Sequence, residues 1–213
     1  MNELFKRIIT SFLLVIILYL SFNNKYILFI SLFLIFYISL TELKNICFKI
    51  FKNNFKKFIF LSLAILFLIS FLIISWLLFT KDNQSKNLIL FLLCISISTD
   101  IGGYVFGKLF KGKKLTTISP NKTYSGMVGS FILATSSPLL FLNILVININ
   151  IFLFAFIISL VSQIGDLFFS FLKRKAKIND TGNILPGHGG LLDRVDGLIF
   201  AIPIGYILTE LIK

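Results

Sequence analysis

The sequence predicts an all-α integral membrane protein, a polytopic bundle of about seven transmembrane helices with a cytoplasmic N-terminus. Of its 213 residues, 57% are hydrophobic and only 14% are charged, a balance far from that of a soluble domain. A bilayer core about 30 Å thick needs roughly 20 mostly apolar residues for each spanning helix, and several such stretches are present. The distribution of basic residues between these stretches predicts the orientation.

Seven apolar segments are expected to form the spans. They are residues 8–22, 26–40, 58–79, 88–107, 127–147, 151–172 and 191–212. The short polar turns at 23–25 and 148–150 predict helical hairpins. A cleavable signal peptide is the rival interpretation of the first segment, but no small-residue cleavage site follows it, so we expect this segment to remain a helix.

Basic residues alternate between the two ends of the predicted spans. Most of the 21 Lys and Arg residues precede the first segment or follow the second, the fourth and the sixth. The positive-inside rule therefore places the N-terminus and the three long basic loops in the cytoplasm. Topology and attraction to anionic lipid headgroups account for the net charge of +12, so no nucleic-acid partner is expected.

Polar chemistry is concentrated in the C-terminal part of the chain. Before residue 80 the only acids are Glu3 and Glu42, and nothing there has a catalytic pattern. All 13 glycines, the single histidine and five aspartates lie beyond residue 88. We therefore expect residues 1–80 to form N-terminal transmembrane scaffold helices and residues 81–213 to form the catalytic transmembrane domain.

Asp100 lies near the expected cytoplasmic end of the fourth span. A carboxylate within a membrane costs up to a few kcal/mol, so such residues usually face a protein cavity and serve a function. The alternative is an aspartate that extends to the headgroups beside Lys108. Gly103 and Gly107 have a GxxxG spacing, which is more typical of a close helix contact than of a ligand site.

The loop before the fifth span combines groups that suit an anion. Ser119 and Thr123 supply hydroxyls, Lys122 supplies an ammonium group, and Gly126 permits close approach at the start of a helix. Together they are suited to binding phosphate. The alternative is an ordinary turn and helix entrance, because Ser-Pro-Asn at 119–121 is common in turns.

Acidic, hydroxyl and basic side chains recur at helical spacing where the sixth span ends and the seventh begins. The residues are Asp166, Ser170, Lys173, Arg174, Asp193, Arg194 and Asp196. Carboxylates from two helix ends provide the oxygen ligands that a hard cation such as Mg²⁺ requires. The adjacent cations would bind the remaining phosphate charge.

A glycine-rich turn precedes the seventh span. The amides of Gly189 and Gly190 could approach an anion at the mouth of that helix, although a sharp reentrant turn is an alternative. His188 could be a base, a phosphate contact or a turn residue. Neither a GxSxG elbow nor a GxxxxGK[ST] loop occurs, so serine hydrolases and P-loop ATPases are unsupported.

The polar pattern resembles a family signature over about residues 100–197. Ser170-x-Leu172-Lys173-Arg174-x4-Asn179-Asp180, followed by Pro186-x-His188-Gly189-Gly190-x2-Asp193-Arg194-x-Asp196, is similar to the signature of the CDP-diacylglycerol synthase family, also called phosphatidate cytidylyltransferase. The motifs around Asp100 and Ser119 match in the same order. Three positions depart from the pattern. Asn179 stands where the family usually has Lys, Ser125 stands where many members have an acidic residue, and Gly197 stands where Ser is frequent.

The resemblance implies a reaction, a cofactor and a set of roles. CTP and phosphatidic acid would give CDP-diacylglycerol and pyrophosphate, for phospholipid biosynthesis at a bacterial inner membrane with the active site facing the cytoplasm. The catalytic residues would be Asp166, Asp193, Asp196, Lys173 and Arg174, with the three aspartates holding Mg²⁺. Asp100, Ser119, Lys122, Thr123, Ser170, His188, Gly189, Gly190 and Arg194 would bind the substrates. A second cation and a homodimer are left open.

Two other classes remain as alternatives at this stage. A CTP-dependent kinase of a polyprenol or phytol-like alcohol resembles this family in architecture, but it would need a base for the hydroxyl. A transporter or channel also places acids in a membrane, although the polar groups here gather at one side. Release of CDP would indicate the kinase, and uptake without CTP consumption would indicate the transporter.

Overall fold

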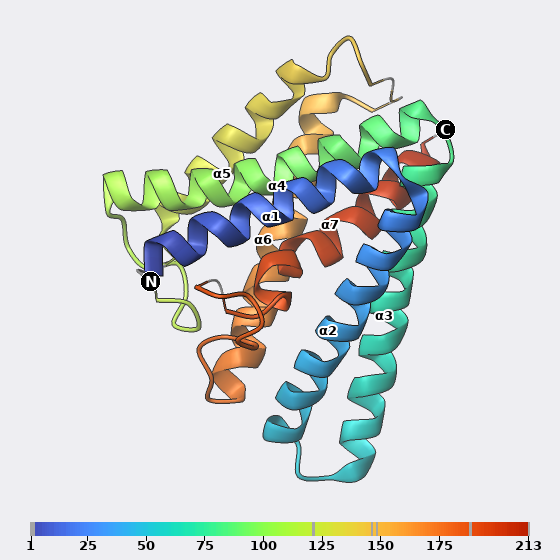
Figure 1. The fold of residues 1–213 in the computed structure, drawn as a ribbon. Helices are drawn as coiled ribbons and strands as arrows, with labels where there is room; N and C mark the ends of the chain where they lie inside the picture. The colour runs from blue at the N-terminus through green and yellow to red at the C-terminus, as the bar shows by residue number, and fades with distance from the viewer. Residues whose placement is uncertain (1–2, 121, 146, 148, 188, 213) are drawn as a thin grey trace. The chain divides into compact units, whose positions relative to one another are not determined.

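The computed structural model describes residues 3–120, 122–145, 147, 149–187 and 189–212. Within these residues the chain forms seven α-helices and one short 3-10 helix, with no β-strand (Figure 1). The helices are α1 (Glu3–Asn23), α2 (Lys25–Ile50), α3 (Asn54–Thr80), α4 (Asn83–Phe110), α5 (Tyr124–Ser136), η1 (Ser137–Leu140), α6 (Ile151–Lys175) and α7 (Leu192–Leu211). The predicted all-α class is confirmed.

Five of the described helices are long and apolar enough to cross a membrane: α1 from Phe5, α2, α3, α4 and α6. The chain is therefore an integral membrane protein. Helix α5 is much shorter than the predicted span 127–147, since its 13 residues extend about 20 Å at about 1.5 Å per residue. It ends before η1 because Pro138 has no N–H to continue the helical bonding.

Helix α2 is longer than the predicted span 26–40. It continues to Ile50, so Lys44 and Lys49, which were expected in a loop, lie on the helix. Glu42, Leu43, Ile46 and Cys47 are buried in this extension, at spacings that place them along one face of a helix. Packing of that face against the protein explains why the helix continues beyond its most apolar part.

The chain divides into two compact units, and helices α6 and α7 contribute residues to both. Unit 1 comprises Met1–Trp76 and Leu172–Val195, and unit 2 comprises Leu77–Phe171 and Asp196–Lys213. The segment after α6 therefore packs with the N-terminal helices instead of with the rest of the C-terminal half. The assignment of scaffold and catalytic roles to residues 1–80 and 81–213 stays a prediction.

In unit 1, helices α1 and α2 form a hairpin around Asn24 (Figure 1). The Asn24 side chain accepts hydrogen bonds from the amides of Tyr26 and Ile27, which satisfies the start of α2. The hydroxyls of Ser21 and Ser31 join the two helices at 3.2 Å. The predicted hairpin at 23–25 is confirmed.

In unit 2, glycines bring helices α4 and α5 into backbone contact. A Cβ atom at Gly102 would overlap the carbonyl of Gly129, and one at Gly126 would lie 2.7 Å from the carbonyl oxygen of Gly103. The Ser130 hydroxyl donates to the Thr99 carbonyl at 2.7 Å. Small residues allow this approach, as is usual between membrane helices.

The close contact predicts a stability effect at Gly102. Gly102→Val places methyl groups against the α5 backbone and should destabilise the protein by about 1–3 kcal/mol, as overpacked cores do. Ile101→Val is the control, because the Ile101 side chain is exposed on the same helix. Thermal unfolding in detergent measures both, and equal midpoints for Gly102→Val and wild type would contradict the packing described.

Candidate functional site

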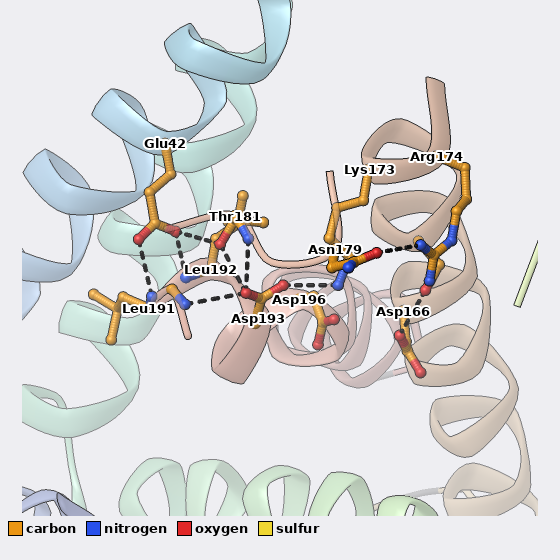
Figure 2. Close-up of polar contacts among 12 residues, drawn as sticks. Glu42, Asp166, Lys173, Arg174, Asn179, Thr181, Leu191, Leu192, Asp193 and Asp196 are labelled. Atoms are coloured by element: carbon orange, nitrogen blue, oxygen red, sulfur yellow. Dashed lines mark hydrogen bonds and ion pairs between the residues drawn. The ribbon is translucent and has the colours of Figure 1, made fainter. Parts of the chain in front are cut away.

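The carboxylate of Asp193 lies in the first turn of α7 and is surrounded by donors from unit 1 (Figure 2). Its Oδ1 accepts from the Lys173 ammonium at 2.7 Å. Its Oδ2 accepts from the backbone amides of Thr181 and Gly190, at 2.9 and 3.1 Å. The side chain is only 7% exposed, so these groups replace water around the charge.

Two glycines with positive φ shape the turn that leads into α7. Gly187 and Gly189 have φ values of 78° and 80°, which side chains disfavour. The amide of Leu185 donates to the carbonyl of Gly189 at 3.0 Å and closes the turn. The turn directs the Gly190 amide to Asp193. In this structure the Gly190 amide contacts a carboxylate of the protein itself. Binding of a substrate anion by the Gly189 and Gly190 amides stays a prediction.

The Asp193 carboxyl group lies at the start of α7, outside the five candidate spans, and has a lowered pKa. Burial raises this pKa, but the Lys173 hydrogen bond and charge, together with the amides of Thr181 and Gly190, lower it by more. The group is therefore ionised at neutral pH. The stability that these contacts contribute is lost only as the pH falls toward the lowered pKa.

Glu42 of α2 is part of the same hydrogen-bonded network, and sequence reasoning missed it. Its side chain is 2% exposed. Oε1 accepts from the amide of Leu191 at 3.0 Å, and Oε2 accepts from the amide of Leu192 at 2.9 Å and from the Thr181 hydroxyl at 2.7 Å. The available signal was an acid inside a continuing helical pattern, four residues before the buried Ile46.

Unit 2 contains a second lysine–carboxylate pair. Lys122, which precedes α5, forms an ion pair with Asp166 of α6, and both side chains are partly exposed. The Ser170 hydroxyl donates to the other oxygen of Asp166 at 3.4 Å. Asp166 and Ser170 therefore lie on one face of α6, as their spacing predicted. Lys122 contacts Asp166 on that face.

The remaining members of the predicted site have simpler settings. Thr123 caps α5 by accepting from the Gly126 amide at 3.1 Å. Arg174 donates a hydrogen bond to the Asn179 side chain at 3.0 Å. Asn179, which stands where the family usually has Lys, thus contacts a basic residue of the signature. Asp196 accepts from the Gly197 amide at 2.8 Å. Asp100, Arg194 and Ser119 are at least partly exposed, and His188 lies outside the described residues.

A pocket of about 510 Å³ lies beside the Asp193 network in unit 1. It is lined by Asn45, Phe48 and Lys49 of α2 and by residues 178 and 180–183. Thr181 therefore faces both this pocket and the carboxylates of Glu42 and Asp193. Its walls combine an aromatic ring, amides, an ammonium group and a carboxyl group, which suits a polar ligand.

The donor chemistry of the aspartates fits a hard cation. Carboxylate oxygens are the ligands that Mg²⁺ prefers, and one carboxylate has capacity for about four contacts. The lysine partners of Asp166 and Asp193 show that these two carboxylates stabilise positive charge beside them. Within the described ranges, no three His, Cys, Asp or Glu side chains are grouped closely enough to form a metal centre by themselves.

Comparisons with known proteins identify relatives. The model of the Cytidylyltransferase family matches residues 2–212. A protein of Staphylococcus haemolyticus named phosphatidate cytidylyltransferase is 39% identical over 134 residues, which cover 61% of this chain and 52% of the relative. A protein of Rickettsia felis with the same name is 38% identical over 142 residues, covering 62% of this chain and 63% of the relative. The chain spans about half the length of the staphylococcal relative it matches.

The Lys173–Asp193 pair predicts a coupled effect on stability. Lys173→Met leaves the buried carboxylate without its cation and should cost about 3–5 kcal/mol. Lys177→Met is the control, since Lys177 is exposed in the same segment. Adding Asp193→Asn to Lys173→Met should recover much of the loss. Additive effects of the two substitutions on thermal unfolding in detergent would show that the pair contributes nothing.

Proposed function

We propose that this chain, which belongs to the cytidylyltransferase family, transfers the cytidylyl group of CTP to phosphatidic acid and forms CDP-diacylglycerol and pyrophosphate. The observation that supports this most is the set of lysine–carboxylate pairs. Lys122 pairs with Asp166, and Lys173 pairs with Asp193. Within its own unit, each pair holds both signs of charge, which suits a phosphate group together with a cation.

The reaction places few demands on side-chain chemistry. An oxygen of the lipid phosphate forms a bond to the α-phosphorus of CTP, while the bond from that phosphorus to the bridging oxygen of the β-phosphate breaks. The leaving group is pyrophosphate. The attacking oxygen is already ionised, so no covalent protein intermediate is required, and catalysis comes from alignment and charge stabilisation.

The basic residues would bind the phosphates. Lys122 and Lys173 each hold an ammonium group beside a carboxylate, and each can exchange part of that contact for a phosphate oxygen. Arg174 and Arg194 are exposed and add planar donors that can bind two oxygens at once. Ser119, Thr123, Ser170 and Asp100 complete the proposed substrate contacts, together with the turn at Gly189 and Gly190.

Asp166, Asp193 and Asp196 would hold Mg²⁺. When bound, the ion would neutralise negative charge on the substrate phosphates and on the leaving pyrophosphate. We propose that the site faces the cytoplasm at a bacterial inner membrane. The alternation of basic segments along the sequence supports the orientation, and the relatives named above are bacterial proteins. We include a homodimer in the proposal, and only the resemblance to the family supports it.

An assay of the purified chain tests the proposed reaction. In detergent with CTP, phosphatidic acid and Mg²⁺, we expect pyrophosphate and a CDP-lipid in equal amounts, and no product after chelation of the metal. Formation of CDP with a phosphorylated lipid alcohol, when such an alcohol is supplied, would indicate the kinase class instead.

Asp193→Asn tests the metal assignment. The amide keeps the shape of the side chain but removes the charge, so turnover should fall by about 100-fold or more, as losses of charged groups in metal sites do. Asp82→Asn is the matched control, because Asp82 caps α4 and asparagine is also a good cap. Undiminished turnover in Asp193→Asn would refute the role of Asp193 as a metal ligand.

A further inference from the structure

Glu42 is the one acidic residue of helix α2, which is mostly apolar. Its side chain is 2% exposed and lies within a candidate membrane span. Burial of a carboxylate is unfavourable unless hydrogen-bond donors compensate for the lost water. The three donors described above supply that compensation, and all three are neutral groups in the segment 181–192.

Two of these donors are amides at the start of α7. The first amides of a helix have no partner within the helix, and a side chain at the cap position usually satisfies them. Leu191 and Leu192 have apolar side chains, and the oxygens of Glu42 accept from both of their amides. The positive end of the helix dipole further favours a carboxylate there. Helix α7 is thus capped by a residue of another helix.

The loop is shaped to admit this carboxylate. A Cβ atom at Gly182 would lie 2.6 Å from Oε1 of Glu42, and one at Gly190 would lie 2.7 Å from Oε2. A Cβ at Gly190 would also overlap the Thr181 hydroxyl. Glycine at both positions therefore allows the backbone to close around Glu42, which is an observation independent of the hydrogen bonds.

Thr181 connects Glu42 to Asp193. Its hydroxyl lies 2.7 Å from Oε2 of Glu42 and 3.1 Å from Oδ2 of Asp193. One hydroxyl has a single hydrogen, so it donates to the closer Glu42, while the Thr181 amide donates to Asp193 at 2.9 Å. The same residue thus holds both carboxylates, and the position of Asp193 depends on where Glu42 fixes Thr181 and the start of α7.

We propose that Glu42 is a positioning residue, which orients Asp193 by capping α7 and by fixing Thr181. It acts through these groups and does not contact substrate itself. The effect on catalysis rests on the proposed function, because there Asp193 holds the cation. The structural part of the inference does not depend on the reaction, so the two can be tested separately.

Hydrogen exchange of the full chain in detergent tests the structural part. In Glu42→Gln, one accepting oxygen becomes an amide NH₂ group, which donates and cannot accept a hydrogen bond. The backbone amides of segment 181–193 should then exchange about 10-fold faster, while those of α4 and α5 exchange at the wild-type rate. Ser39→Ala is the matched control, since Ser39 is buried one turn earlier on α2. Unchanged exchange of this segment in Glu42→Gln would overturn the inference, whatever the activity.

The magnesium dependence of turnover tests the catalytic part. Glu42→Gln should raise the half-saturating Mg²⁺ concentration by about 10-fold or more, because groups that orient metal ligands typically change affinity by that amount. A residue that only supported folding would lower the active fraction at an unchanged half-saturating concentration, and that result would overturn the proposed role. If wild type makes no CDP-lipid, the proposed function fails, and hydrogen exchange still decides the role of Glu42.

A second pair of variants covers the case in which Glu42→Gln does not fold. Thr181→Val removes the hydroxyl between the carboxylates, whereas Thr181→Ser retains it. We expect the valine variant to show faster exchange at 181–193 and a raised half-saturating Mg²⁺ concentration, and the serine variant to match wild type. Equal behaviour of the two variants would overturn the link from Glu42 through Thr181 to Asp193.

Discussion

A carboxylate that water cannot reach must find its donors within the protein, and this constraint shapes the segment around the start of α7. Asp193 takes an ammonium group and two amides, and Glu42 takes two amides and a hydroxyl. The glycines at 182 and 190 make room for these contacts. The geometry of the turn, the capping of α7 and the lowered pKa of Asp193 all follow from the hydrogen bonds that these two buried carboxyl groups accept.

Hydropathy predicted the fold class and nearly all of the helices, because transfer to lipid dominates the placement of long apolar segments. It failed at two helix ends, where other physics decides. Helix α2 continues past residue 40 because Leu43 and Ile46 pack against protein. Helix α5 ends at Ser136, next to a proline turn, although the following residues are apolar. Hydropathy does not distinguish burial in protein from burial in lipid.

Residue spacing and motif order selected Asp193, Lys173, Gly190 and the Lys122 loop as members of one functional set. Within each unit the structure places some of these together, as Lys173 with Asp193 and Lys122 with Asp166. The sequence marked Glu42 only as an acid within a helical pattern and could not predict its role, because Glu42 and its partner Thr181 are separated by 139 positions. A partner so far along the chain leaves no pattern in the local sequence, and only the fold brings its hydroxyl within hydrogen-bonding distance.

The central claim is that the α-phosphate of CTP is joined to a lipid phosphate. The most direct measurement supplies the purified chain with phosphatidic acid and CTP labelled with ³²P at either the α or the γ position. Our account predicts that the α label enters the lipid fraction in a Mg²⁺-dependent manner and that the γ label leaves as pyrophosphate. Entry of the γ label into lipid, or of neither label, would contradict it.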